Sequence, residues 1–139
     1  MGPTRYLVDK SAYARYGKLP VKQRLRPLVR AGLLAICAAV EVELLHSARS
    51  KSDAEQLRVG LRGLDWLVTP DEVWDRAIEV QTLLVGAGNW RAVSMADLVI
   101  AAVAERHQVT VMHYDGDFDM IGEVTGQPVE WVVPAGTAD

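Results

Sequence analysis

Four short acidic signatures, centred on Asp9, Glu43, Asp97 and Asp115, are spaced widely along this chain. Most of them fall near a predicted end of a helix or strand. Carboxylates that a fold gathers in one place repel each other and raise one another's pKa values. Mg²⁺ and Mn²⁺ remove that cost, since they prefer oxygen ligands, and they support hydrolytic chemistry. The acidic residue types therefore predict a metal-assisted hydrolytic site, provided that the fold brings them together.

The elements that must position these acids alternate between strand and helix. We predict strands over residues 5–8, 33–37, 64–68, 109–114 and, more weakly, 129–133. Helices are predicted over residues 11–16, 21–31, 38–48, 53–62, 71–85 and 94–107, with a short helical turn at 118–121. Alternation of this kind is typical of an α/β fold with a mostly parallel sheet of four or five strands and helices on both faces. We expect one domain over residues 1–139, with a frayed tail at about 135–139.

Two of the acids directly follow predicted strands. Asp9 ends the first strand and Asp115 follows the fourth, and ligands of open α/β sheets bind at the carboxyl ends of the strands. Asp9 also suits a helix cap or a turn. Ser11, two positions later, suits either a helix cap or a contact to water or phosphate.

The helical acids leave alternatives open. Glu41 and Glu43 lie two positions apart, about 200° around a helix, so at most one of them can easily face the site. Asp97 lies on an apolar helical stripe, where a carboxylate is costly unless it is compensated. The pair Ser94 and Asp97 also resembles a capping box, and the two interpretations of Asp97 are compatible.

The acidic run from Asp115 to Asp119 fits some known motifs only partly. An EF-hand loop that begins at Asp115 would need glycine and glutamate where Met120 and Gly126 stand. An aspartyl-phosphate phosphatase would need further motifs downstream, and only about 20 residues remain. A structural turn is the plain alternative for any one of these aspartates. The three histidines show no paired ligand spacing, and we place each of them at the surface or its boundary.

The formal net charge of −3 hides a strong asymmetry. Residues 1–62 carry 12 Lys and Arg against 5 Asp and Glu, and residues 63–139 carry 3 against 13. A basic region beside an acidic site is typical of polyanion binding, although a solvated helix face is an equal alternative. The single cysteine, Cys37, excludes an internal disulfide, and its apolar surroundings predict an inert buried thiol. Without a signal peptide or a membrane-length apolar run, we expect a soluble cytoplasmic protein.

Four motifs in this order resemble the PIN-domain ribonucleases, specifically the VapC-type toxins of bacterial type II toxin–antitoxin pairs. They are L-V-D-K-S-A at 7–12, E-L-L-H-S-A-R at 43–49, A-D-L-V-I-A-A-V-A at 96–104 and V-M-H-Y-D-G-D-F-D at 111–119. The resemblance covers nearly the whole chain and implies a PIN-like three-layer α/β/α sandwich. It assigns the catalytic acids to Asp9, Glu43, Asp97 and Asp115, with Asp117 a close competitor for the fourth acid. Lys10 departs from the family pattern, which usually has Thr there, whereas Ser11 matches its small hydroxyl residue.

The resemblance implies a Mg²⁺- or Mn²⁺-dependent endoribonuclease that cuts structured RNA, such as tRNA or a ribosomal RNA loop. The implied metal ligands are Asp9, Asp97, Asp115 and Asp117, with Ser11 in support. The implied contacts to RNA come from basic residues of the first half: Arg15, Lys22, Arg24 and Arg26. The implied partners are a small VapB-like antitoxin and a second copy of the chain. The alternatives are a non-toxin PIN nuclease of RNA processing and a non-catalytic α/β binding module whose acids cap helices.

Overall fold

The computed structural model describes residues 2, 3 and 5–139. Five short strands form one sheet in the order β3-β2-β1-β4-β5, and every neighbouring pair is parallel. The strands are β1 (Tyr6–Val8), β2 (Leu34–Ile36), β3 (Asp65–Trp66), β4 (Thr110–His113) and β5 (Val129–Trp131). The predicted α/β class is confirmed, and the sheet is fully parallel rather than mostly so.

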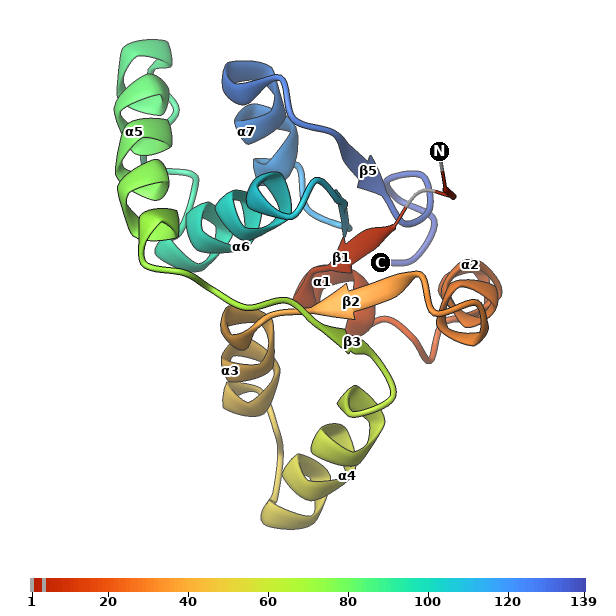
Figure 1. Cartoon of the computed structure of the whole chain (residues 1–139). Helices are drawn as coiled ribbons and strands as arrows, with labels where there is room; N and C mark the ends of the chain where they lie inside the picture. The colour runs from red at the N-terminus through yellow and green to blue at the C-terminus, as the bar shows by residue number, and fades with distance from the viewer. Residues whose placement is uncertain (1, 4) are drawn as a thin grey trace.

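The described helices connect these strands in a three-layer α/β/α sandwich (Figure 1). They are α1 (Lys10–Tyr13), α2 (Leu19–Arg30), α3 (Ala38–His46), α4 (Lys51–Leu61), α5 (Glu72–Ala87), α6 (Met95–Arg106) and α7 (Asp117–Thr125). Helices α5, α6 and α7 pack against one another, whereas α4 contacts α3 and projects from the body at the bottom of the view (Figure 1).

The strand order places a topological switch point between β1 and β4. The chain builds outward from β1 through β2 to β3 on one side, and the later strands β4 and β5 extend the other side. Leu7 pairs with Val111 and Val8 with Met112, so β1 and β4 end at the same edge. At such a point the two connections leave in opposite directions and open a crevice at the carboxyl ends of the strands. Asp9 and Asp115 follow the two strands that flank this crevice.

Helix α6 is the central helix of the fold. Every residue from Asp97 to Ala104 is buried, and the helix packs on β1, β4, α5 and α7. A helix that is apolar on all sides is stable only when it is enclosed in this way. The first turn of α6 is therefore held rigidly, and Asp97 lies in that turn.

Several predicted boundaries differ from the structure. Helix α2 begins at Leu19 rather than at 21 and continues through an internal proline, Pro27. The hydrogen bond that Pro27 cannot donate would go to the carbonyl of Gln23, and Gln23 is exposed, so water can satisfy that carbonyl. Helix α7 extends to Thr125 rather than 121, because Phe118 and Ile121 bury one face and Gly126 ends the helix in the left-handed conformation.

The expected frayed tail is instead held against the body. The Tyr114 hydroxyl accepts hydrogen bonds from the backbone N–H groups of Gly136 (2.7 Å) and Ala138 (3.0 Å) and donates one to Asp139 Oδ1 (2.7 Å). Arg15 Nε donates to the Ala138 carbonyl at 3.1 Å. These bonds could not be foreseen, because they join the tail to residues far away in the chain. Cys37 is buried as predicted, and no helix among the described residues is long and apolar enough to cross a membrane.

Candidate metal-binding active site

Asp9 lies at the point where β1 passes into α1. Its backbone N–H continues the parallel pairing with Met112 (2.9 Å), and its side chain caps α1 by accepting the N–H of Ser11 at 3.0 Å. The side chain is buried, and its Oδ1 atom has no hydrogen-bond partner among the described residues. Burial raises the pKa of this carboxyl, and the bonds from Ser11 oppose that rise. The helix cap is therefore Asp9 itself rather than Ser11, and the Oδ1 atom of Asp9 is left without a hydrogen-bond partner.

Ser11 joins the ends of the two strands at the switch point. Its hydroxyl donates to Asp9 Oδ2 at 2.6 Å and accepts the backbone N–H of Tyr114 at 2.8 Å. A hydroxyl can donate one hydrogen bond while it accepts another, which suits this bridging position. The bridge fixes Asp9 relative to the chain that leaves β4.

Asp97 both takes part in the capping box of α6 and faces other acidic residues, as the sequence allowed. Ser94 Oγ accepts the N–H of Asp97 at 3.2 Å, and Asp97 Oδ2 accepts the N–H of Ser94 at 3.3 Å, which completes a capping box. The side chain is only 7% exposed. Burial raises the pKa of Asp97 to about 7; the Ser94 bonds oppose the rise, and the carboxylates of Asp9 and Asp115 add to it.

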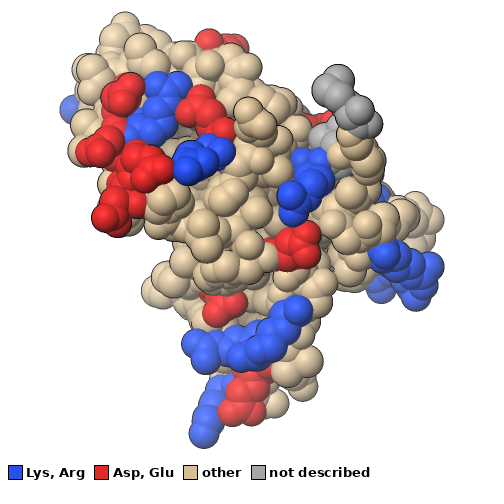
Figure 2. All heavy atoms as spheres, viewed as in Figure 1, with Lys and Arg blue, Asp and Glu red and all other residues tan. Residues whose placement is uncertain are grey.

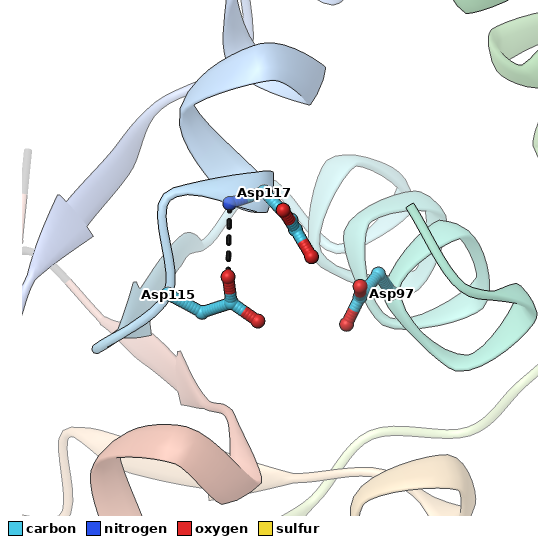
Figure 3. A group of neighbouring side chains, drawn as sticks. All are labelled: Asp97, Asp115 and Asp117. Carbon is cyan, nitrogen blue, oxygen red and sulfur yellow. Dashed lines mark hydrogen bonds between the residues drawn. The ribbon is translucent and has the colours of Figure 1, made fainter. Parts of the chain in front are cut away.

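Asp115 and Asp117 approach Asp97 from the loop between β4 and α7. Each of the three residues offers a carboxylate oxygen, and these three oxygens lie within 4.8 Å of one another. Figure 3 shows the three side chains turned toward a common point, with the N–H of Asp117 bonded to Asp115 Oδ1 at 3.0 Å. Burial, followed by the charge of Asp115, raises the pKa of Asp117. The two residues that the sequence left as competitors thus both face Asp97.

Glu43, on α3, lines a cavity that it shares with Asp9, Asp97 and Asp115. The cavity has a volume of about 350 Å³ and is lined by Asp9, Lys10, Ser11, Arg15, Glu43, Asp97, Tyr114 and Asp115. Burial raises the pKa of Glu43, the charge of Asp9 adds to the rise, and the nearby Lys10 opposes it. Glu41, on the same helix, does not line this cavity.

This arrangement has the character of a site for a hard divalent cation. The donors are carboxylate oxygens, which Mg²⁺ and Mn²⁺ prefer. Without a cation, the burial of so many acids is unfavourable, and the pKa values of Asp9, Asp97, Asp117 and Glu43 are all raised. The Oδ1 atom of Asp9 is also buried without a partner, which costs free energy, and a bound cation would supply that partner.

The basic residues predicted to contact RNA are not gathered at one place. Arg15 lines the acidic cavity, where its Nη1 donates to the Ser11 carbonyl at 2.7 Å and its guanidinium lies over the Tyr114 ring. Lys22 and Arg26 line a surface hollow on α2. Arg24 instead forms an ion pair with Glu130 at 2.8 Å, so its charge is already partly neutralised. Figure 2 shows basic side chains over α2 at the right and over α4 at the bottom.

His113 is the residue beside the site that the sequence prediction misplaced. We expected it at the surface or its boundary, but it is fully buried at the end of β4. Its Nδ1 atom accepts the backbone N–H of Asp115 at 3.1 Å. The signal in the sequence was its place within an apolar strand directly before the acidic loop.

Comparison with known proteins agrees with this geometry. A family model described as PIN domain matches residues 6–124. The chain belongs to the PIN domain family. It is 51% identical to Ribonuclease VapC21 of Mycobacterium tuberculosis over 97% of this chain and 99% of that protein. It is also 39% identical to Ribonuclease VapC51 of the same organism, over 97% of this chain and 98% of the relative.

Solved structures share the fold at much lower identity. The chain matches a DNA-bound VapBC from Salmonella typhimurium with a TM-score of 0.76 and 14% identity, over 94% of this chain and 100% of the other. A VapBC2 from Rickettsia felis, bound to a promoter DNA fragment, matches with a TM-score of 0.77 and 18% identity. This match covers 92% of this chain and 98% of the other. These matches confirm the predicted PIN-like architecture, and the curated relatives place the chain in the VapC group of the family.

Proposed function

We propose that this chain is a metal-dependent endoribonuclease that acts as the toxin of a toxin–antitoxin pair. The observation that carries the proposal is the approach of the Asp97, Asp115 and Asp117 oxygens within 4.8 Å of one another, in a protein whose relatives are named ribonucleases. The proposed metal ligands are these three residues together with Asp9, whose Oδ1 is unpartnered. The metal would be Mg²⁺ or Mn²⁺.

The bound metal would polarise the scissile phosphate and supply an activated water for hydrolysis. The residues of the chain would hold the metal and accept a proton from water. Asp9 and Asp97 are held by their caps, so their carboxylates need little reorganisation. Glu43 stands at the cavity, and burial raises its pKa, which makes its carboxylate a stronger base toward water.

Cations at the cavity rim would hold the RNA backbone. Lys10 and Arg15 line the cavity beside the acids, and their charges would attract a phosphate that enters it. Lys22 and Arg26 would extend the contact along α2. Phosphate contacts of this kind position a nucleic acid without reading its sequence. We propose structured RNA, such as tRNA or a ribosomal RNA loop, as the substrate class.

We propose two protein partners as well: a small VapB-like antitoxin and a second copy of this chain. The support is the VapBC composition of the structural relatives and a set of exposed apolar side chains. Apolar patches of this kind mark interaction surfaces. They lie on α3, on α5 and at the start of α6: Val42, Trp74, Ile78 and Met95. Light scattering of the purified chain tests the dimer, and co-purification with the product of a neighbouring small reading frame tests the antitoxin. The proposed compartment is the cytoplasm.

The deciding experiment is cleavage of total RNA by the purified protein with Mn²⁺, with Mg²⁺ and with EDTA. Asp97→Asn serves as the inactive variant, and Glu41→Gln serves as a matched control, since Glu41 lies on α3 outside the cavity. Discrete fragments that require metal and disappear only with Asp97→Asn support the nuclease. Equal cleavage by wild type and Asp97→Asn contradicts it. Induction in bacteria separates a toxin, which arrests growth, from a nuclease of RNA processing, which does not.

A further inference from the structure

His113 is a buried polar ring that the proposed chemistry does not use. It ends β4 with no exposed surface, and its ring packs between Phe118 and Trp131 at centroid distances of 5.3 and 5.1 Å. A polar ring in apolar surroundings is costly unless its nitrogens have partners. The contacts of the two nitrogens therefore indicate why the ring is there.

The first nitrogen holds the backbone of an acidic residue of the cluster. Nδ1 accepts the N–H of Asp115 at 3.1 Å, which requires a lone pair on Nδ1. The proton of the neutral ring must then be on Nε2.

The second nitrogen faces a carboxylate that is fixed in turn. Asp119 Oδ1 lies 3.7 Å from Nε2, too far for a hydrogen bond but close enough for electrostatic attraction to the N–H. The other oxygen of Asp119 accepts the indole N–H of Trp131 at 2.9 Å. Asp119 therefore favours the tautomer that leaves Nδ1 free to accept.

This contact acts at the position where the chain turns toward the acidic cluster. The N–H of Tyr114 is held by Ser11, the N–H of Asp115 by His113, and the N–H of Asp117 by the Asp115 carboxylate. Three side chains thus fix the backbone between β4 and α7. We propose that His113 is a positioning residue that orients the Asp115 carboxylate toward Asp97 for metal binding, a role that rests on the proposed function.

The tautomer of His113 gives a test that needs neither metal nor a variant. A long-range ¹H–¹⁵N spectrum of the metal-free wild type at neutral pH shows which ring nitrogen carries the proton. The expected result is a neutral ring with its proton on Nε2. A proton on Nδ1, in either the neutral or the charged ring, excludes the bond to Asp115 and overturns the inference.

Two substitutions then separate the hydrogen bond from packing. His113→Asn keeps an acceptor oxygen near the position of Nδ1, whereas His113→Leu keeps apolar bulk without an acceptor. Loss of a partner that orients a metal ligand weakens metal affinity by roughly 10–100-fold. We expect His113→Leu to bind Mn²⁺ more weakly than the wild type by that factor, as measured by calorimetry. We expect His113→Asn to retain much more of the wild-type Mn²⁺ affinity. Ile121→Val, which trims a buried side chain of α7, serves as the packing control and should bind Mn²⁺ as the wild type does.

The outcomes distinguish this inference from the proposed function. If a folded His113→Leu protein binds Mn²⁺ as tightly as the wild type, the positioning role is wrong and the nuclease proposal stands. If Ile121→Val weakens Mn²⁺ binding as much as His113→Leu, the effect is general loss of packing and the positioning role is again wrong. If the wild type binds no Mn²⁺, the metal site fails, and the role of His113 fails with it.

Discussion

The hydroxyl of Ser11 accepts a hydrogen bond of 2.8 Å from the backbone N–H of Tyr114, which lies 103 positions later in the chain. The same hydroxyl donates to Asp9. One small side chain thus fixes the register between the ends of β1 and β4, from which two of the acids come. From the sequence we predicted Ser11 as a helix cap, as a contact to water or phosphate, or as a support for the metal ligands. Its structural role is to join the two halves of the site.

Replacement of Ser11 by Ala should destabilise the protein and weaken the site. The Tyr114 N–H would lose its partner, and an unsatisfied buried donor costs about 1–3 kcal/mol. Chemical denaturation measures the loss of stability, and RNA cleavage by the folded variant measures the effect on the site. Ser47→Ala is a suitable control, because Ser47 Oγ donates only to a carbonyl within α3's last turn. Equal stability and activity of the two variants would show that the bridge contributes nothing.

The contribution of Asp97 to the stability of the metal-free protein should fall as the pH rises toward neutrality. Its pKa is raised from 3.8 to about 7, so the folded chain binds this proton more tightly than the unfolded chain does. By linkage, this contribution to stability is complete below about pH 4 and is lost as the pH rises through about 7. Denaturation of wild type and Asp97→Asn across this range, in EDTA, isolates the effect. A stability difference between the two that does not change with pH would contradict the raised pKa.

Divalent metal should reverse this destabilisation. A cation that binds only the folded chain at one hundred times its dissociation constant adds about 2.7 kcal/mol of stability. Thermal unfolding should therefore shift upward with Mn²⁺ for the wild type and for Glu41→Gln. The shift should be largely lost in Asp9→Asn, Asp97→Asn and Asp115→Asn. An undiminished shift in all three variants would place the metal elsewhere.

The basic residues of α2 should differ in their importance for RNA binding. Arg24 is paired with Glu130, whereas Lys22 and Arg26 line an open surface hollow. Loss of one phosphate contact reduces the salt dependence of binding by about one unit of slope. We expect that reduction for Lys22→Ala and Arg26→Ala, and a smaller one for Arg24→Ala. Binding isotherms of an inactive Asp97→Asn background at several salt concentrations test it, and identical slopes for all three would refute the distinction.

Removal of one hydroxyl should release the C-terminal segment. Tyr114→Phe keeps the ring under the Arg15 guanidinium but loses the oxygen that binds Gly136, Ala138 and Asp139. Hydrogen exchange at the Gly136 and Ala138 amides should become markedly faster, while exchange in α6 should stay slow. Unchanged protection of those two amides would mean that other contacts hold the tail.

The sequence predicted the order of elements and the acids because both leave local signals. Buried strands followed by Asp9 and Asp115 are visible in the apolar pattern, and the Ser94–Asp97 spacing is a local capping signal. Contacts between distant segments leave no such signal. The docked tail, the Arg24–Glu130 pair and the burial of His113 depend on which elements become neighbours. Glu43 could be preferred to Glu41 only through the family resemblance, because helical spacing alone does not say which face meets the sheet.

The order of the strands also bears on how the protein is made. The acidic cavity and the three-aspartate cluster together draw on residues from position 9 to position 117, and β4 is the last strand to join β1. A chain still emerging from the ribosome, with β1 to β3 and α6 already synthesised, lacks Asp115 and Asp117. Such a nascent chain contains most of the fold's mass but not the complete proposed metal site. For the proposed ribonuclease, hydrolysis of RNA would therefore begin only when synthesis of the chain is nearly complete.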